Sequence, residues 1–385
     1  MANLYPAIDF DFKALTCADK LIFCVLRENL NNFWDENCRN SGVDWEEFLQ
    51  KAQAYRIEPL LYTGLRGFSS IPNEVIDRLK TSFVSTFYRN IVLARELSGI
   101  IKKLNERKIE TIVLKGVSLS ACVYDDWSLR GFNDADLLVK KEDFFSVRAV
   151  LKELGYELLC EKKIKSSLKY RSQAMFVKDG KYFIDVHWHL LDLDRYNKAI
   201  NLDLGKIWDR REPLKINEID SARLSLNDMI VYLCLHQAIQ HGLKGLIWYL
   251  DIYKIIKKYS DGIDWEKIAD DAVTYRVKRP VYYVLTFVSD MFNAQIPQFV
   301  FEKIKPGINK FGQGFVLRNL KRANISVNSE YILTPFLFDT LPQAANFVLF
   351  YSFRSPAHFF YSIKLFFRSF SPAIRLFLKG RGNGR

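Results

Sequence analysis

The chain has 385 residues, of which 49% are hydrophobic and 15% aromatic, which excludes a disordered tail and allows a large core in about two or three domains. Its six cysteines form no CxxC motif, acids stand at Asp9 and Asp11, and no apolar stretch reaches the roughly 18 residues of a membrane span. We therefore expect a reduced, cytoplasmic protein without a signal peptide or a membrane-crossing segment. The net charge of +12 lies in the last 114 residues, where 16 Lys and Arg against 4 Asp and Glu favour an anionic partner.

The hydrophobic pattern divides the chain into four regions. Residues 1–108 have helical spacing, as in "LARELSGIIKKLNERK", and predict a helical N-terminal region. Residues 109–215 alternate short β-like runs with helical runs and predict an α/β core. Residues 216–330 return to helical spacing, as in "LSLNDMIVYLCLHQAIQHG", and predict a helical C-terminal domain. Residues 331–385 are expected to form an aromatic, basic tail.

The α/β core has a definite order of predicted elements. Strands are expected at "ETIVLKG", "DADLLVK", "YELL", "AMFVK" and "KYFIDVHWHL". One helix is expected from about Ser118 and another over "EDFFSVRAVLKELG", which Gly155 ends. The turn-prone "REPLKINEID" is expected to be a connector. This order predicts an α+β fold, with a small mixed sheet and helices packed against it.

Two carboxylates, Asp134 and Asp136, start the strand "DADLLVK", and side chains two apart on a strand share a face. Their repulsion indicates either a solvated strand edge or a bound cation. Upstream, "VLKGVSLSA" turns through Gly116 into a helix N-terminus, whose free backbone N–H groups suit phosphate oxygens. Lys115, at the end of that strand, has two interpretations, a triphosphate contact or a solubilising charge.

A third carboxylate, Asp185, lies in "YFIDVHWHL" with His187 and His189 at alternate positions, so the three side chains can share a face. If this strand lies beside the Asp134 strand, three carboxylates converge. Carboxylates suit Mg²⁺, which commonly binds through one or two of them plus substrate phosphates. Two such ions about 3.5 to 4 Å apart can activate a hydroxyl and stabilise leaving pyrophosphate. The alternative for Asp185 alone is a turn cap.

The sequence resembles a known family in "LKGVSLSACVYDDWSLRGFNDADLLV", "VLKELGYEL", "IDVHWHL" and "LCLHQAIQHG…WYLDIYKII…IDWEKI", over roughly residues 102–272. This is the uncharacterised nucleotidyltransferase family of the DNA polymerase β-like superfamily. The resemblance implies the minimal nucleotidyltransferase fold, with Gly116 and Ser118 at the Gly-Ser turn, Asp134 and Asp136 as paired metal ligands and Asp185 as third carboxylate. The chain departs from the pattern because Val separates Gly116 from Ser118 and Asp134 lies 18 residues past Gly116.

The histidines and Arg130 allow more than one interpretation. Arg130 is expected either to bind a phosphate or to pair with a loop aspartate, Asp125 or Asp126. The HxH formed by His187 and His189 is compatible with zinc, but no cysteine cluster completes a tetrahedral set.

We expect His187 to hydrogen-bond the acidic cluster from outside the metal's own ligands, and His236 to pack toward the cleft. His236 and His241 are five apart on a predicted helix, an awkward spacing for one metal. For His187 and His236, the alternative is a buried histidine whose nitrogens are satisfied.

Together these features predict a Mg²⁺-dependent enzyme that transfers a nucleoside monophosphate from an NTP, expected to be ATP, to an acceptor. The three carboxylates would bind the metal ions, and the triphosphate would be held by Lys115, Gly116, Ser118 and Arg130. A small molecule or a protein is expected as acceptor in preference to RNA. The alternatives are a catalytically inactive nucleotide-binding protein with a regulatory or scaffolding role, and an RNA-directed nucleotidyltransferase.

The tail "HFFYSIKLFFRSFSPAIRLFLKGRGNGR" suggests a membrane contact. Lys364, Arg368, Arg375 and Lys379 fall in one stripe of a helical projection, and Phe, Leu and Ile fill most of the rest. An in-plane helix with cations at lipid phosphates on the inner face of the membrane fits this pattern. The alternative is a terminal helix docked on the protein's own core.

Overall fold

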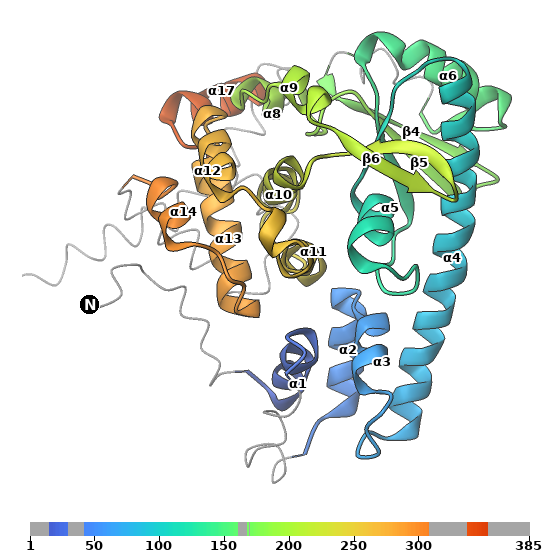
Figure 1. The fold of residues 1–385 in the computed structure, drawn as a ribbon, viewed down its shortest axis with the longest axis vertical. Coiled ribbons are helices and arrows are strands. Elements are labelled where there is room, and N and C mark those ends of the chain that lie inside the picture. Colours follow the sequence, from blue (N-terminus) through green and yellow to red (C-terminus); the bar gives the residue numbers. More distant parts are fainter. Residues whose placement is uncertain (1–14, 30–41, 161–167, 169, 308–336, 353–385) are drawn as a thin grey trace, which may run out of the picture.

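The computed structural model describes residues 15–29, 42–160, 168, 170–307 and 337–352 (Figure 1). Within these residues the strands form one seven-stranded sheet in the order β3-β4-β5-β2-β1-β7-β6. The β2–β5 and β1–β7 pairs are parallel and the others are antiparallel. The sheet is mixed and helices pack against it, so the α+β class predicted from the sequence is confirmed.

The strands have the following bounds: β1 (Ile112–Leu114), β2 (Asp134–Leu138), β3 (Glu157–Leu158), β4 (Gln173–Lys178), β5 (Tyr182–His187), β6 (Glu212–Ile216) and β7 (Ile219–Arg223). The helices before the sheet are α1 (Cys17–Leu26), α2 (Trp45–Tyr55), α3 (Glu58–Leu65) and α4 (Asn73–Glu106). Those among the strands are α5 (Lys115–Leu119), α6 (Phe144–Glu153), α8 (Asp194–Ala199) and α9 (Leu204–Asp209). Those after it are α10 (Leu226–Leu235), α11 (Leu246–Lys258), α12 (Trp265–Thr274), α13 (Lys278–Phe292), α14 (Gln298–Lys303) and α17 (Leu341–Ser352). The π-helical turns η3 (Ser120–Tyr124) and η6 (His236–Gln240) extend α5 and α10.

The turn-prone stretch 211–220 was expected to be a connector, and this expectation is wrong. The stretch supplies most of the β6–β7 hairpin. Asn217 and Glu218 both have positive φ, 47° and 64°, which is the backbone of a two-residue hairpin turn of type I′. Leu214 and Ile216 alternate with exposed residues and are buried. β7 then pairs with β1, so this hairpin extends the sheet next to the strand that leads into α5.

Alternation along β2 decides where the carboxylates point. Ala135 and Leu137 are buried in the core that the sheet forms with α4 and α6. Because neighbouring side chains on a strand point to opposite faces, Asp134 and Asp136 point to the other face. On that face Leu138 belongs to the core built by the C-terminal helices, including α10, α11 and α13. The carboxylates therefore lie between the sheet and these helices.

Helix α4 connects the two ends of the molecule (Figure 1). It has 34 residues, packs on α3 near its start and reaches the sheet and α6 near its end. Its buried Asn90 side chain donates hydrogen bonds to the carbonyls of Trp127 (2.7 Å) and Arg130 (2.9 Å), and accepts one from the N–H of Phe132 (3.4 Å). This amide therefore holds the loop that leads into β2 and its carboxylates.

Part of the C-terminal region lies within the described residues. Helix α17 packs on α8, where Phe347 stacks on Tyr196 with ring centroids 5.4 Å apart. The basic stripe of Lys364, Arg368, Arg375 and Lys379 lies outside the described residues. Among those that are described, none of the helices has the length and apolar character needed to span a membrane.

Gly116 has no room for a side chain, because α5 packs closely against Phe132 in the loop before β2. A Cβ built on it would lie 2.7 Å from Cβ and 3.1 Å from Cγ of Phe132, closer than packed atoms tolerate. We expect Gly116→Ala to lower the free energy of unfolding by about 1 to 3 kcal/mol, because the buried Phe132 must shift. Denaturant unfolding measures this change.

Gly99→Ala is the matched control. Gly99 is exposed in α4, and a Cβ there would meet nothing within 4 Å. We expect this variant to gain about 0.5 to 1 kcal/mol from the better helix propensity of alanine. An equal effect of both substitutions would show that the contact with Phe132 does not constrain residue 116.

Candidate active site

Pairing between β2 and β5 brings two carboxylates together. The two strands are parallel, and their register places Asp136 directly beside Asp185. His187, two residues further along β5, points to the same face. One potential ligand atom from each of these three buried side chains lies within 4.8 Å of the others, an arrangement that can hold a metal ion. Asp134 lies two pairs earlier, opposite Phe183, and is outside this group of three.

Two cationic side chains contact the carboxylates of the acidic cluster, which we define as Asp136, Asp185 and His187. One of the two cations, His187, belongs to the cluster itself. Lys115 Nζ donates to Asp136 Oδ1 at 2.9 Å. His187 Nε2 lies 2.9 Å from the same oxygen and 3.4 Å from Asp185 Oδ2, so the imidazole bridges the two carboxylates. A nitrogen between two carboxylate oxygens carries the proton, which makes Nε2 the donor.

These contacts shift the pKa values in opposite directions. Burial favours neutral Asp136, but the Lys115 ammonium and the His187 hydrogen bond hold the pKa of Asp136 well below its usual range. Burial likewise opposes the charged form of His187, but the charge of Asp185 and the hydrogen bond to Asp136 raise its pKa to about 9. The stability that the ion pairs of His187 contribute to the fold is therefore complete below its ordinary pKa of 6.5 and is lost as the pH rises through about 9.

Asp134 is in the opposite situation. Burial and the negative charge of Asp136 raise its pKa to about 6. The two aspartates share a strand face, but Asp136 takes the hydrogen bonds from Lys115 and His187. Of these two aspartates, Asp134 is therefore the one whose charge its surroundings balance less well.

Several buried polar atoms at the cluster have no hydrogen-bond partner among the described residues. They include Asp185 Oδ1 and His187 Nδ1. Buried polar atoms are rarely left unpaired in folded proteins, and such atoms indicate an ion, water or ligand. The carboxylates of Asp136 and Asp185 are hard oxygen donors that suit a divalent cation, so the residues present fit a metal ion.

Helix α10 and its π-helical extension η6 form the wall opposite the sheet. Tyr232 and His236, one helical turn apart, both interact electrostatically with Lys115. His236 is buried, its Nε2 lies 3.2 Å from Nε2 of His241, and its Nδ1 has no partner among the described residues. Burial, and then the charge of Lys115, lower the pKa of His236 well below its usual value, so its imidazole is neutral. His241 stacks on Trp248 with ring centroids 3.7 Å apart.

Arg130 does not pair with Asp125 or Asp126. Its Nε and Nη2 bind the carboxylate of Asp251 on α11, with contacts of 2.9 and 2.8 Å, and Nη1 donates to the carbonyl of Gly131. Asp251 is fully buried and also accepts from the Tyr124 hydroxyl at 2.7 Å. The guanidinium therefore ties the loop before β2 to the C-terminal helices.

The other residues predicted to hold the triphosphate lie around α5. Lys115 begins this helix and reaches the acidic cluster, whereas Gly116 packs against Phe132. Ser118 is buried, and within the described part of the chain its hydroxyl makes no hydrogen bond to the cluster.

Sequence reasoning missed Tyr232 and Asp251. Tyr232 stands four residues before His236, a helical spacing that could have indicated their shared face. Asp251 is 121 residues from Arg130, and no local pattern marks that pairing.

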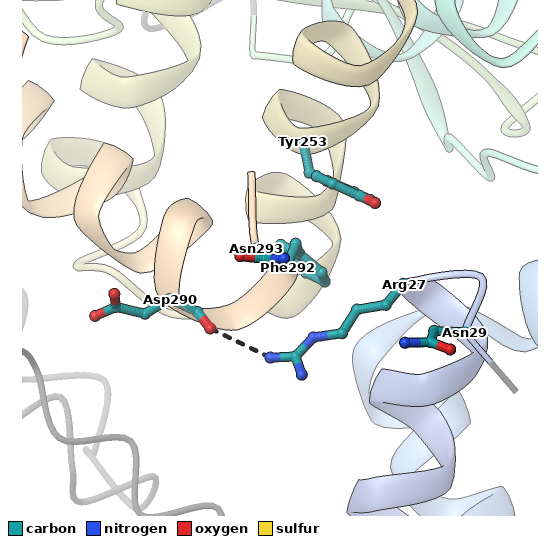
Figure 2. A pocket seen from close by; sticks show the side chains of 6 residues that line it. All are labelled: Arg27, Asn29, Tyr253, Asp290, Phe292 and Asn293. Atoms are coloured by element: carbon teal, nitrogen blue, oxygen red, sulfur yellow. Dashed lines mark hydrogen bonds between the residues drawn. The ribbon is translucent and has the colours of Figure 1, made fainter. Parts of the chain in front are cut away.

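A separate cavity of about 390 Å³ lies between the end of α1 and the helices α11 and α13 (Figure 2). Its lining residues are Arg27, Asn29, Tyr253, Asp290, Phe292 and Asn293. Arg27 donates to the backbone carbonyls of Met291 (2.7 Å) and Asp290 (3.2 Å). Burial raises the pKa of the Asp290 carboxyl to about 6. None of these lining residues belongs to the acidic cluster.

Comparison with known proteins identifies the class of the chain. A family model described as uncharacterised nucleotidyltransferase matches residues 41–293, a range that contains all the described strands and the acidic cluster. The chain belongs to this family, as its sequence motifs predict, and is therefore a transferase of the nucleotidyltransferase class.

A solved structure, that of ANT(2")-Ia in complex with adenylyl-2"-tobramycin, is similar to 48% of this chain and 96% of that chain. The sequence identity is 13% and the TM-score is 0.33. A likeness at this level assigns neither a substrate nor a residue role. A search of curated proteins finds no match.

Asp134 and Asp136 should respond oppositely to removal of their charge. We expect Asp134→Asn to raise the free energy of unfolding at pH 7 by about 1 to 2 kcal/mol, because it removes a poorly balanced charge that is partly exposed. Asp136→Asn should lower it by about 3 kcal/mol, because Lys115 and His187 lose their shared partner. Urea unfolding at several pH values measures both changes.

The pH dependence provides the check. The folded pKa of Asp134, about 6, exceeds its ordinary value of 3.8, so its charge destabilises the fold above pH 6 and has no effect below pH 3.8. The gain from Asp134→Asn should therefore fade between these two values. A gain that is independent of pH, or a shift of the same sign in both variants, would contradict this account.

Proposed function

We propose that this protein transfers a nucleoside monophosphate from an NTP to the hydroxyl of an acceptor, with release of pyrophosphate. The observation that carries the proposal is the parallel pairing that sets Asp136 beside Asp185, with a buried oxygen of Asp185 left unpartnered among the described residues. The family of the chain supports the reaction class. We propose ATP as the nucleotide and the cytoplasm as the location.

The carboxylates would hold the divalent metal, with Mg²⁺ as the expected ion. Asp136 and Asp185 would bind it directly, and Asp134 would join them from the same strand face. When bound, the metal would lower the pKa of an attacking hydroxyl and stabilise the leaving pyrophosphate. His187 would hold the two carboxylates in register through its bridging Nε2.

The triphosphate would lie toward α5 and α10. Lys115 supplies a positive charge at this point, and Tyr232 and His236 line the same side of the site. Gly116 and Ser118 are included because they stand in the place of the superfamily's Gly-Ser turn, although Val117 separates them here. Arg130 would act at a distance, by fixing the loop before β2 through Asp251.

The acceptor is proposed to be a small molecule or a protein. An RNA-directed reaction and a catalytically inactive nucleotide-binding protein with a regulatory or scaffolding role are the alternatives. Carboxylates at all three positions, Asp134, Asp136 and Asp185, favour an active enzyme, because a protein that only binds nucleotide needs fewer of them. The membrane contact of the basic tail stays a proposal that rests on sequence alone.

The test is label transfer from α-³²P-labelled NTPs to components of a cell extract, with Mg²⁺ present. We expect Asp136→Asn and Asp185→Asn to lose transfer by at least about a hundredfold, because each removes a metal ligand. Asp290→Asn is the matched control, since Asp290 is also a partly buried acid with a raised pKa but lies in the separate cavity, and it should keep full activity.

Full transfer by either cluster variant would refute the metal assignment. If wild type transfers no label but Mg²⁺ with ATP still raises its melting temperature, the inactive nucleotide-binding protein is correct. If wild type does transfer label, treatment of the labelled product with ribonuclease, protease or neither identifies the class of acceptor.

A further inference from the structure

The ammonium of Lys115 occupies an oxygen that a metal ion would need. Asp136 Oδ1 already has two partners at 2.9 Å, Lys115 Nζ and His187 Nε2. His187 Nε2 also reaches Asp185 Oδ2, so both carboxylates of the cluster are engaged by cationic nitrogens. A divalent ion bound between the same oxygens would stand next to both cations and be repelled by them.

The two nitrogens differ in how easily they can leave. His187 is fully buried at the end of β5, where its backbone is paired with both β2 and β4. The Lys115 side chain is 17% exposed and has a flexible four-carbon stem. Lys115 is therefore the cation that can move away without disturbing the sheet.

The backbone places Lys115 for this role. Leu114, the residue before it, pairs with Asp136 across the β1–β2 ladder, so the lysine starts next to the carboxylate that it binds. Its φ is +45°, in the left-handed region that residues with a side chain rarely adopt. Strained backbone of this kind persists where surrounding structure enforces it, and it is concentrated at functional sites.

We propose that Lys115 is an internal cation that neutralises the acidic cluster in the metal-free protein and is displaced when a divalent ion binds. The freed ammonium then lies on the side of Tyr232 and His236, where it contacts the triphosphate. This inference rests on the proposed function, because it assumes that the cluster binds a metal. It adds that metal binding creates part of the nucleotide site, so the two ligands bind cooperatively.

Mn²⁺ affinity, measured by electron paramagnetic resonance without nucleotide, tests the displacement. We expect Lys115→Met to bind Mn²⁺ about tenfold or more tightly than wild type, because no buried ion pair has to be broken first. The same variant should bind Mg²⁺·ATP more weakly, since it lacks the freed ammonium. Lys140→Met is the control, because Lys140 is paired with Glu110 on the surface at the end of β2, and its Mn²⁺ affinity should match that of wild type.

A second measurement uses the wild-type protein in case Lys115→Met does not fold. Acetic anhydride acylates free amines, and mass spectrometry reports the acylation of each lysine. Saturating Mg²⁺ alone should raise the acylation of Lys115 several-fold and leave that of Lys140 unchanged. Unchanged acylation of Lys115, or Mn²⁺ affinity that is equal or weaker in Lys115→Met, would overturn the proposal.

Failure of this inference can be distinguished from failure of the proposed function. If wild type binds Mn²⁺ and Asp136→Asn does not, the metal site stands, and Lys115→Met alone decides the role of the lysine. If wild type binds no Mn²⁺, with or without ATP, both the metal assignment and the displacement are wrong.

Discussion

The arrangement of the site follows from one constraint, the placement of two buried carboxylates side by side on parallel strands. Asp136 and Asp185 are neighbours in the β2–β5 ladder, and both are almost completely shielded from water. Like charges at this separation repel strongly where water is excluded. The metal-free fold offsets that repulsion with Lys115 and His187, which converge on one oxygen of Asp136. A metal ion would do the same with a single larger charge.

The rest of the fold holds this pair in position. Ala135 and Leu137 pack in the core with α4 and α6, and this fixes Asp134 and Asp136 on the opposite face of β2. Asn90 holds the loop before β2 from one side, and the buried Arg130–Asp251 pair ties the same loop to α11 from the other. Removal of one partner from such a buried pair leaves an uncompensated charge, so the loss of either Arg130 or Asp251 would strongly destabilise the fold.

The sequence predicts which side chains of the site share a strand face better than it predicts which strands pair with each other. Period-two alternation places Asp134 with Asp136, and Asp185 with His187, because the face of a side chain is a local property of a strand. Which strands pair is not local, so the convergence of Asp136 with Asp185 stays conditional until the sheet order is known. For the same reason the Arg130–Asp251 pair could not be predicted from the sequence. Lys115 likewise kept two interpretations, because its contact with Asp136 is visible only in the folded chain.

The error at 211–220 has a different cause. Turn residues in "REPLKINEID" suggest a connector, but Asn217 and Glu218 form the tight turn of a hairpin, and the buried Leu214 and Ile216 show the alternation of a strand. A short edge strand that contains proline gives a weak signal, because its packing partners come from elsewhere in the chain. The family motifs do not correct this error, because they include the residues of the site and do not include residues 211–220.

Anomalous X-ray scattering from Mn²⁺, in crystals grown with a non-hydrolysable ATP analogue, tests whether Asp136 and Asp185 hold the metal while Lys115 moves aside. We expect a Mn²⁺ peak within coordination distance of Asp136 and Asp185, with the triphosphate on the side of α5 and α10 and Lys115 moved off the Asp136 oxygen. A metal peak away from these carboxylates, or a nucleotide bound elsewhere while Lys115 still pairs with Asp136, would contradict this expectation.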